Sequence, residues 1–234
     1  VVITGCGARK SALLLERYAR GPIEDARAVG QPVAWTLEPV VQTKTQGGVE
    51  VTVNHASAEY LKNFFDNEKL FGPFAGRTPY YPEHLVFYVS IANRSQERIR
   101  IDPNTFRLLD DRGNQLGVIG VDYVTAFAEY RQPVATTTSG VLEEAKPGYF
   151  GVGLPIGKLF AKPQWRFALL KQSALQGGDL YPGVTHDGLI TFWSPVPLAQ
   201  KLSLVIANVQ TDFDPRDEPR QSIEFVFDFE ASHP

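Results

Sequence analysis

The sequence predicts an all-β protein, an antiparallel β-sandwich with a few short helical insertions. Segments in which apolar and polar residues alternate recur along the chain, and this period of two indicates strands with one face on a core. Turn residues separate the segments, and helical spacing is confined to short stretches. The last segment is the clearest, with apolar residues at alternate positions: Ile223, Phe225, Phe227 and Phe229.

The expected strands can be followed in order from residue 33. Residues 33–45 precede Gly47 and Gly48, a turn signal that predicts a hairpin into the alternating strand of residues 49–53. Asp110 to Asn114 forms the turn of a second hairpin. Further alternating segments lie at residues 84–91, 98–102, 106–108, 116–118 and 202–206.

Short helices are expected between the strands. Ser57 can cap a segment in which Tyr60, Leu61, Phe64 and Phe65 share one face. The other expected helices cover residues 11–20, the segment after Asp122, and residues 168–176.

The chain divides into two parts by these patterns. We expect residues 1–32 to be a tether that contains a short helix, and residues 33–234 to be the β-sandwich domain. Within that domain, residues 33–80 could form a hairpin and helix extension of a core at residues 81–234.

Composition argues against nucleic-acid binding and against a membrane-spanning body. The formal net charge of −3 provides no basic field for phosphates, so nucleic acid is not an expected partner. No stretch reaches the roughly 18 apolar residues that span a bilayer, so the body is not expected to cross one.

The first residues suggest a different relation to a membrane. The stretch from Val2 to Gly7 reads VITGCG, with an apolar residue and small residues before Cys6, the single cysteine of the chain. It resembles the lipobox of bacterial lipoproteins, which implies that Cys6 carries acyl chains and that the chain is cut just before it. Each buried CH₂ of such an anchor would contribute about 0.8 kcal/mol. The alternative is a buried or incidental free thiol.

A second resemblance covers roughly residues 80–230. The sequences LVFYVSIANRSQERIRIDPNTFRLLDDRGN and DLYPGVTHDGLITFWSP, with the strands KLSLVIANV and SIEFVFDF, resemble strands and turns of immunoglobulin-like domains of secreted bacterial lipoproteins. In those domains a Pro-Gly turn and a second Gly punctuate a hairpin. The resemblance implies an immunoglobulin-like sandwich that is extracytoplasmic and non-catalytic, although a fold alone does not determine function.

Residues that could carry catalysis or bind metal are scattered. The four histidines, His55, His84, His186 and His233, lack the spacing of a metal site, and we expect neither a metal nor a cofactor. His84 is expected to begin a strand, His186 to lie in a turn, and His233 to lie at the chain end. The acidic stretch at residues 211–218 is predicted to be a hairpin loop, with an irregular calcium site as the alternative.

A glycine-rich apolar segment at residues 147–163 has two interpretations. It could be an insertion packed over one end of the sandwich, or a contact surface for a partner in which Phe150, Leu154 and Ile156 are the anchors.

These observations lead to a hypothesis of function. We expect a non-catalytic, lipid-anchored protein of the bacterial cell envelope, extracytoplasmic and attached to a membrane through its N-terminal lipid, that binds or scaffolds an envelope protein partner. One alternative is a carbohydrate-binding module, with Trp35, Trp165 or Trp193 as an exposed stacking platform. Another is an extracytoplasmic hydrolase, which would need a cleft that joins a histidine with two carboxylates.

Overall fold

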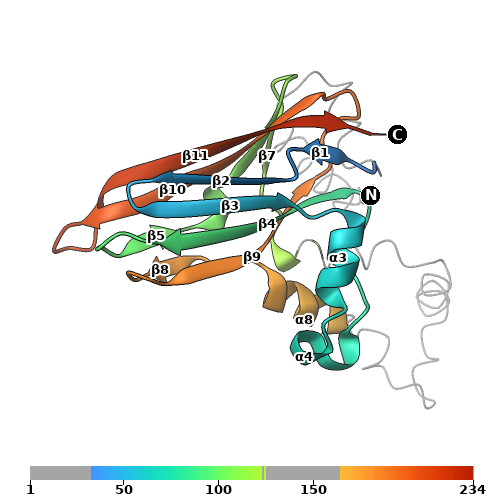
Figure 1. Ribbon diagram of the computed structural model, residues 1–234, viewed down its shortest axis with the longest axis horizontal. Helices are drawn as coiled ribbons and strands as arrows, with labels where there is room; N and C mark the ends of the chain where they lie inside the picture. The colour runs from blue at the N-terminus through green and yellow to red at the C-terminus, as the bar shows by residue number, and fades with distance from the viewer. Residues whose placement is uncertain (1–32, 123, 125–163, 234) are drawn as a thin grey trace, which may run out of the picture.

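The computed structural model describes residues 33–122, 124 and 164–233, which form two antiparallel sheets with short helices at one side (Figure 1). The prediction of an all-β antiparallel sandwich with a few short helices is confirmed. Cys6 and the segment of Phe150, Leu154 and Ile156 lie outside the described residues. In the part of the chain that is described, no helix is both long and apolar enough to cross a bilayer.

The larger sheet has seven strands in the order β1-β11-β10-β5-β8, with β6 paired to β10 and β7 paired to β6. Its strands are β1 (Thr36–Glu38), β5 (Ile99–Ile101), β6 (Arg107–Asp110), β7 (Gln115–Gly117), β8 (Gly178–Leu180), β10 (Lys201–Phe213) and β11 (Pro219–Ser232). The smaller sheet has the order β2-β3-β4-β9. Its strands are β2 (Val41–Gln46), β3 (Val49–His55), β4 (His84–Asn93) and β9 (Thr185–Trp193).

The connections give the sandwich its immunoglobulin-like character. The chain passes between the two sheets from β1 to β2, from β4 to β5, from β8 to β9 and from β9 to β10. The result is a Greek-key arrangement rather than a meander, and the final hairpin of β10 and β11 lies in the larger sheet. The Pro-Gly turn of residues 181–184 therefore joins strands of different sheets, whereas the sequence had suggested a hairpin there.

Turn chemistry and alternation explain the hairpins that the sequence predicts. Gly47 and Gly48 both have positive φ, which lets a two-residue turn join β2 to β3. Residues of β3 alternate between buried and half-buried along its whole length. Trp35 belongs to neither strand of this hairpin, because the chain enters the larger sheet first, where β1 pairs with the end of β11.

The main core lies between the two sheets. Phe225, Phe227 and Phe229 of β11 are at most 2% exposed, which confirms the predicted inward face of the last strand. Phe229 contacts Phe87 of the smaller sheet, with ring centroids 5.5 Å apart. Burial of one such side chain contributes roughly 1.5–3 kcal/mol, so the facing aromatic rings are a main source of stability.

Helices cover the outer face of the smaller sheet and form a second apolar cluster there. Helix α3 (Ala58–Phe65) begins at Ser57, whose Oγ accepts a hydrogen bond from the N–H of Tyr60 at 3.2 Å, as predicted. Next come α4 (Glu68–Phe71) and the 3₁₀ turn η1 (Gly72–Phe74). In Figure 1 these helices and α8 lie together beside β4 and β9.

Helix α8 (Gln164–Ser173) begins and ends earlier than the predicted span of residues 168–176. The helix ends at Ser173 because the next residues pair with β9, where the N–H of Leu175 donates to the carbonyl of Leu189 at 3.0 Å. Pairing with the edge of β9 therefore outweighs the helix propensity of residues 174–176.

Side chains of β2 close the open side of the sandwich against β11. Gln42 donates a hydrogen bond from Nε2 to the carbonyl of Asp228 at 2.7 Å, and Lys44 donates from Nζ to the carbonyl of Val226. The Nζ of Lys44 also lies 5.5 Å from the centroid of the Phe227 ring. An inward-pointing lysine on an edge strand protects the edge from pairing with another chain.

Candidate functional site

A break in the ladder of β10 creates the candidate site. Between Ile206 and Val209 the register with β11 slips, so Ala207 and Asn208 face a single residue of the partner strand. On its other side β10 pairs with β6 up to Val205 and with β5 only at Gln210. The 3₁₀ turn η2 (Pro103–Thr105) lies between those two pairings, and Thr105 Oγ1 donates to the carbonyl of Ala207 at 3.0 Å.

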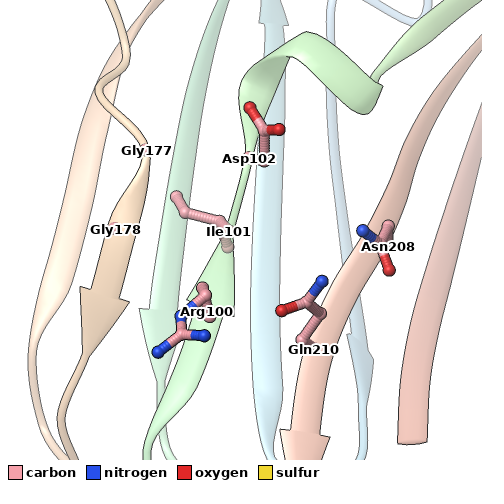
Figure 2. A pocket seen from close by; sticks show the side chains of 7 residues that line it. All are labelled: Arg100, Ile101, Asp102, Gly177, Gly178, Asn208 and Gln210. Carbon is pink, nitrogen blue, oxygen red and sulfur yellow. The ribbon is translucent and has the colours of Figure 1, made fainter. Parts of the chain in front are cut away.

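The space left by this break is an open hollow of about 510 Å³ on the outer face of the larger sheet. Figure 2 shows Asn208 and Gln210 on β10, with Arg100 and Asp102 on the strand opposite. The remaining lining residues are Ile101, Gly177 and Gly178. We call this space the outer hollow.

Asn208 has a φ of 57°, in the left-handed region that only a few residue types tolerate. β-Bulges of this kind turn a side chain in a new direction and are over-represented next to functional sites. The side-chain amides of Asn208 and Gln210 are half-buried and have no hydrogen-bond partner among the described residues. Two half-buried amides that face one hollow can donate to and accept from a polar ligand.

The two carboxylate oxygens of Asp102 differ in their hydrogen-bond partners. Its Oδ1 caps η2 by accepting hydrogen bonds from the backbone N–H of Asn104 at 3.0 Å and from Asn104 Nδ2 at 2.9 Å. Its Oδ2 accepts none from the residues that the structure describes. One oxygen is therefore fixed in place by the turn while the other is open to a ligand.

Ion pairs hold the other wall of the outer hollow. Arg100 donates from Nε to Asp179 at 2.7 Å and from Nη2 to Asp217 at 2.6 Å, and Arg98 donates to the same two carboxylates. Both guanidinium groups also lie over the Phe213 ring, with Cζ 4.2 Å from its centroid for Arg98 and 4.9 Å for Arg100. This network joins β5, β8 and the hairpin loop of β10 and β11, and so fixes the position of Arg100.

The two guanidinium groups lower the pKa of both carboxylates. Hydrogen bonds from Arg100 are the largest cause for Asp179 and for Asp217, and the bond from Arg98 adds to the effect at Asp217. In turn, the hydrogen bonds that these carboxylates accept raise the pKa of Arg98 and Arg100. All four groups therefore stay charged at neutral pH, and their charges cancel.

A second space, which we call the inner pocket, lies beside the outer hollow and has a volume of about 230 Å³. Apolar side chains that line it include Leu170 of α8, Leu189 and Ile190 of β9, and Val118 and Val124 from the segment after β7. Asp102 and Gly177 line both spaces.

Hydroxyl groups supply a polar point inside the apolar wall of the inner pocket. Tyr80 and Thr191 both line the pocket, and both are buried. Burial raises the pKa of Tyr80 to about 12, and hydrogen bonds with Thr191 and Ser173 act in the opposite direction. The Tyr80 hydroxyl is thus neutral at physiological pH and is held within a small hydroxyl cluster.

The histidines named in the sequence lie apart from these two spaces. His55 and His84 are buried at ends of β3 and β4, and the ring of His233 packs edge-on against Trp35. The prediction that His186 lies in a turn is wrong, since residues 185–188 pair with β4 as the start of β9. In the described residues, no three His, Cys, Asp or Glu side chains are close enough to hold a metal ion.

The acidic stretch at residues 211–218 contains the predicted hairpin loop. Asp214 Oδ1 accepts hydrogen bonds from the backbone N–H groups of Arg216 at 2.7 Å and Glu218 at 3.0 Å. Asp217 is held by the two arginines described above. These two carboxylates are therefore already occupied by loop amides and guanidinium groups.

The three tryptophans are each packed against neighbours. Trp35 is 7% exposed and donates a hydrogen bond from Nε1 to Ser194 at 2.6 Å. Trp165 is half-buried under the guanidinium groups of two arginines, and Trp193 is half-buried against the ring of His84.

Alternation and turn residues do not indicate the residues of the outer hollow, although the sequence contains one signal. Leu202, Leu204 and Ile206 alternate in β10, and the next fully buried residue is Val209, with Ala207 and Asn208 between. A change of phase inside an alternating strand is the pattern that a β-bulge produces. Its opposite wall, from Arg100 to Asp102, is about a hundred residues away in the sequence and has no local signal.

Comparison with known proteins gives little further guidance. No protein-family model matches the sequence, and no curated protein matches it. The chain is similar to the crystal structure of the YjhA protein from Bacillus subtilis, with a TM-score of 0.39 and 15% identity over 79% of this chain and 94% of that chain. It is also similar to a functionally unknown protein from Listeria monocytogenes EGD-e, with a TM-score of 0.35 and 12% identity over 92% of this chain and 90% of that one. Both TM-scores lie below 0.5, so neither similarity bears on the function of this chain.

Proposed function

We propose that the protein is a non-catalytic binding protein of the bacterial cell envelope, tethered by a lipid on Cys6, and that the outer hollow is its ligand site. The observation that carries the binding role is the pair of half-buried amides of Asn208 and Gln210, which the bulge in β10 directs at one hollow without a partner from the described residues. Pockets with a few converging polar groups are the usual places for small ligands.

The surroundings of the hollow favour binding over chemistry. Of the titratable groups next to it, Arg100, Asp179 and Asp217 are held in mutual ion pairs that stabilise their charged forms, whereas Asp102 has no ion-pair partner among the described residues. A general acid or base needs a pKa near the working pH, whereas this network moves the carboxylates away from it. The network instead provides a rigid wall, which reduces the ordering cost of binding.

The binding role can be tested with the full chain and a small panel of probes. The probes are D-glucose, L-leucine, hexan-1-ol and hexylammonium chloride, each at millimolar concentration. Binding would be measured by NMR chemical-shift changes of the residues that line the outer hollow and by thermal stabilisation. At least one probe should perturb the amide signals of Asn208 and Gln210 in the wild type. The double variant Asn208→Ala, Gln210→Ala should lose that response.

Gln221→Ala is the matched control, because Gln221 is an exposed amide on the neighbouring strand β11 and does not line the hollow. It should respond as the wild type does. If no probe perturbs the hollow, or if the double variant responds as strongly as the wild type, the outer hollow is not the ligand site.

The tether has its own test, which is independent of the hollow. Mass spectrometry of protein extracted from bacterial membranes should show acyl chains on Cys6, since two such chains together hold a protein stably on a bilayer. Cys6→Ser should move the protein to the soluble fraction. An unmodified Cys6 in membrane-extracted protein would contradict the lipid anchor and leave the binding role standing.

A further inference from the structure

The outer hollow and the inner pocket meet at one point. Gly177 lies on the link between α8 and β8, and a Cβ there would be 3.1 Å from the carbonyl oxygen of Ile101 and 3.2 Å from Cδ of Pro103. The link thus runs tightly against the end of β5, with no side chain between the two spaces at this position. The backbone of Asp102 also passes this point, with its Cα 3.7 Å from the same Cβ position, and Asp102 lines both spaces.

The outer hollow and the inner pocket together form a combined space, and Asp102 gives this space its net negative charge. The other charged residue that lines either space is Arg100, which is neutralised within the network of two arginines and two aspartates. Asp102 has no ion-pair partner among the described residues, and its Oδ2 is open to a ligand. The combined space therefore favours a ligand with one positive charge over an anion.

The inner pocket selects for a different property. Part of its wall is aliphatic, so transfer of an apolar group from water onto that part is favourable. The aliphatic side chains are Val118, Ile119, Val121, Val124, Leu170, Leu175, Leu189 and Ile190, and they lie beside polar groups that include Tyr80 and Thr191. Its volume of about 230 Å³ suits a short alkyl group rather than a lipid. The polar groups near its mouth, Asp102, Asn104 and Gln176, are all exposed.

We propose that the two spaces together bind one small organic cation, an ammonium compound with a short alkyl chain. The ammonium group donates to Asp102 Oδ2 and to the side-chain oxygens of Asn208 and Gln210, and the alkyl chain occupies the inner pocket. This ligand class rests on the proposed binding function of the outer hollow, because it assigns a ligand to that site.

A pair of probes of equal length separates the charge from the chain. Hexylammonium and hexan-1-ol would be titrated into the full chain at low ionic strength, with NMR and calorimetry as readouts. We expect hexylammonium to bind up to about fivefold more tightly, the upper end of the range for one partly exposed ion pair, and to lose most of that preference in high salt.

The variant Asp102→Asn removes the charge and keeps the structure, because asparagine caps a helical turn as well as aspartate does. It should bind the two probes equally and retain the wild-type affinity for hexan-1-ol. Asp66→Asn is the matched control, an equal loss of charge at an exposed residue that lines neither space, and it should keep the preference.

A chain-length series tests the inner pocket without any substitution. Affinity should rise from ethylammonium through butylammonium to hexylammonium, and the amide signals of Leu170 and Leu189 should shift only with the longer chains. Equal affinity for ethylammonium and hexylammonium would overturn the role of the inner pocket.

Different results would refute the organic-cation assignment and the binding function. If Asp102→Asn keeps the preference for hexylammonium, or if the wild type shows none while hexan-1-ol or glucose still perturbs Asn208, the organic-cation assignment is wrong and the binding function stands. If no probe perturbs the hollow at all, both proposals fail together.

Discussion

Strands β4 and β10 are both central and both long, but the pairing of β4 is continuous and the pairing of β10 is interrupted. β4 keeps one register with β9 over nine consecutive pairs, from His84 with Trp193 to Ala92 with Thr185. β10 slips its register with β11 after Ile206 and changes partner from β6 to β5. The continuous strand contributes buried side chains to both faces of its sheet, whereas the interrupted strand presents half-buried polar side chains to a hollow.

This difference separates the part of the sandwich that provides stability from the part that can bind. Unbroken pairing gives the backbone N–H and C=O groups of the strand their partners within the sheet. A bulge leaves backbone and side chains that need other partners, and a ligand can be one of them. Substitutions in the two regions should therefore differ in kind as well as in size.

The largest effect is expected in the core. Phe227→Ala should lower the free energy of unfolding by about 3–5 kcal/mol, because Phe227 is fully buried between the sheets and its removal leaves a cavity. Gln210→Ala, in the interrupted region, should change it by less than about 0.5 kcal/mol. Urea unfolding of both variants measures the contrast, and similar losses in the two would refute the division between the regions.

A pH effect is expected at the end of β3, in the continuous sheet. Burial lowers the pKa of His55 from 6.5 to about 4, so the folded protein holds this ring neutral at a pH where the unfolded chain would protonate it. Its contribution is complete above about pH 6.5 and is lost as the pH falls toward 4, at a total cost of about 3 kcal/mol.

Urea unfolding at pH 7 and at pH 4.5 would measure this loss. His55→Gln should flatten the pH dependence over that interval, because glutamine does not titrate. NMR titration of the ring gives the pKa directly, and a value near 6.5 in the folded protein would contradict the effect of burial at this site.

The continuous parts of the fold are the parts that the sequence predicts well. The last strand follows from alternation, the turn between β2 and β3 from Gly47 and Gly48, and the start of α3 from Ser57, all of which are local signals. The start of β9 does not follow from the sequence, because Thr185 to Gly188 resembles a turn in composition. Gly188 is needed there for a tertiary reason, since a Cβ would lie 2.4 Å from the backbone nitrogen of Leu175.

The candidate site follows from the sequence only in part. The phase shift before Val209 marks the bulge, but nothing local shows that Asp102 and Gly177 lie across from it. Those contacts arise from the Greek-key connections, which bring together segments far apart in the chain. The residues proposed from sequence, Cys6 and Phe150 with its neighbours, lie outside the described residues, and their roles remain predictions.

The smallest effect on stability is expected at Asn208, in the bulge of β10 that distinguishes this strand from β4. Asn208 has a φ of 57°, and a Cβ in the left-handed region costs roughly 1–2 kcal/mol for most residues but nothing for glycine. Asn208→Gly should therefore leave the free energy of unfolding within about 0.5 kcal/mol of the wild type. Asn208→Val, at the same position, should lower it by about 1–2 kcal/mol, because a β-branched side chain tolerates this conformation poorly.

Both variants remove the amide, so both should weaken the response of the outer hollow to its ligand, although only the valine variant should be less stable. Urea unfolding and the NMR response to the probes, measured on the same samples, separate the two properties. If valine costs no more stability than glycine, the backbone at residue 208 is not held in the left-handed conformation in solution, and the break in β10 would not position Asn208 for binding.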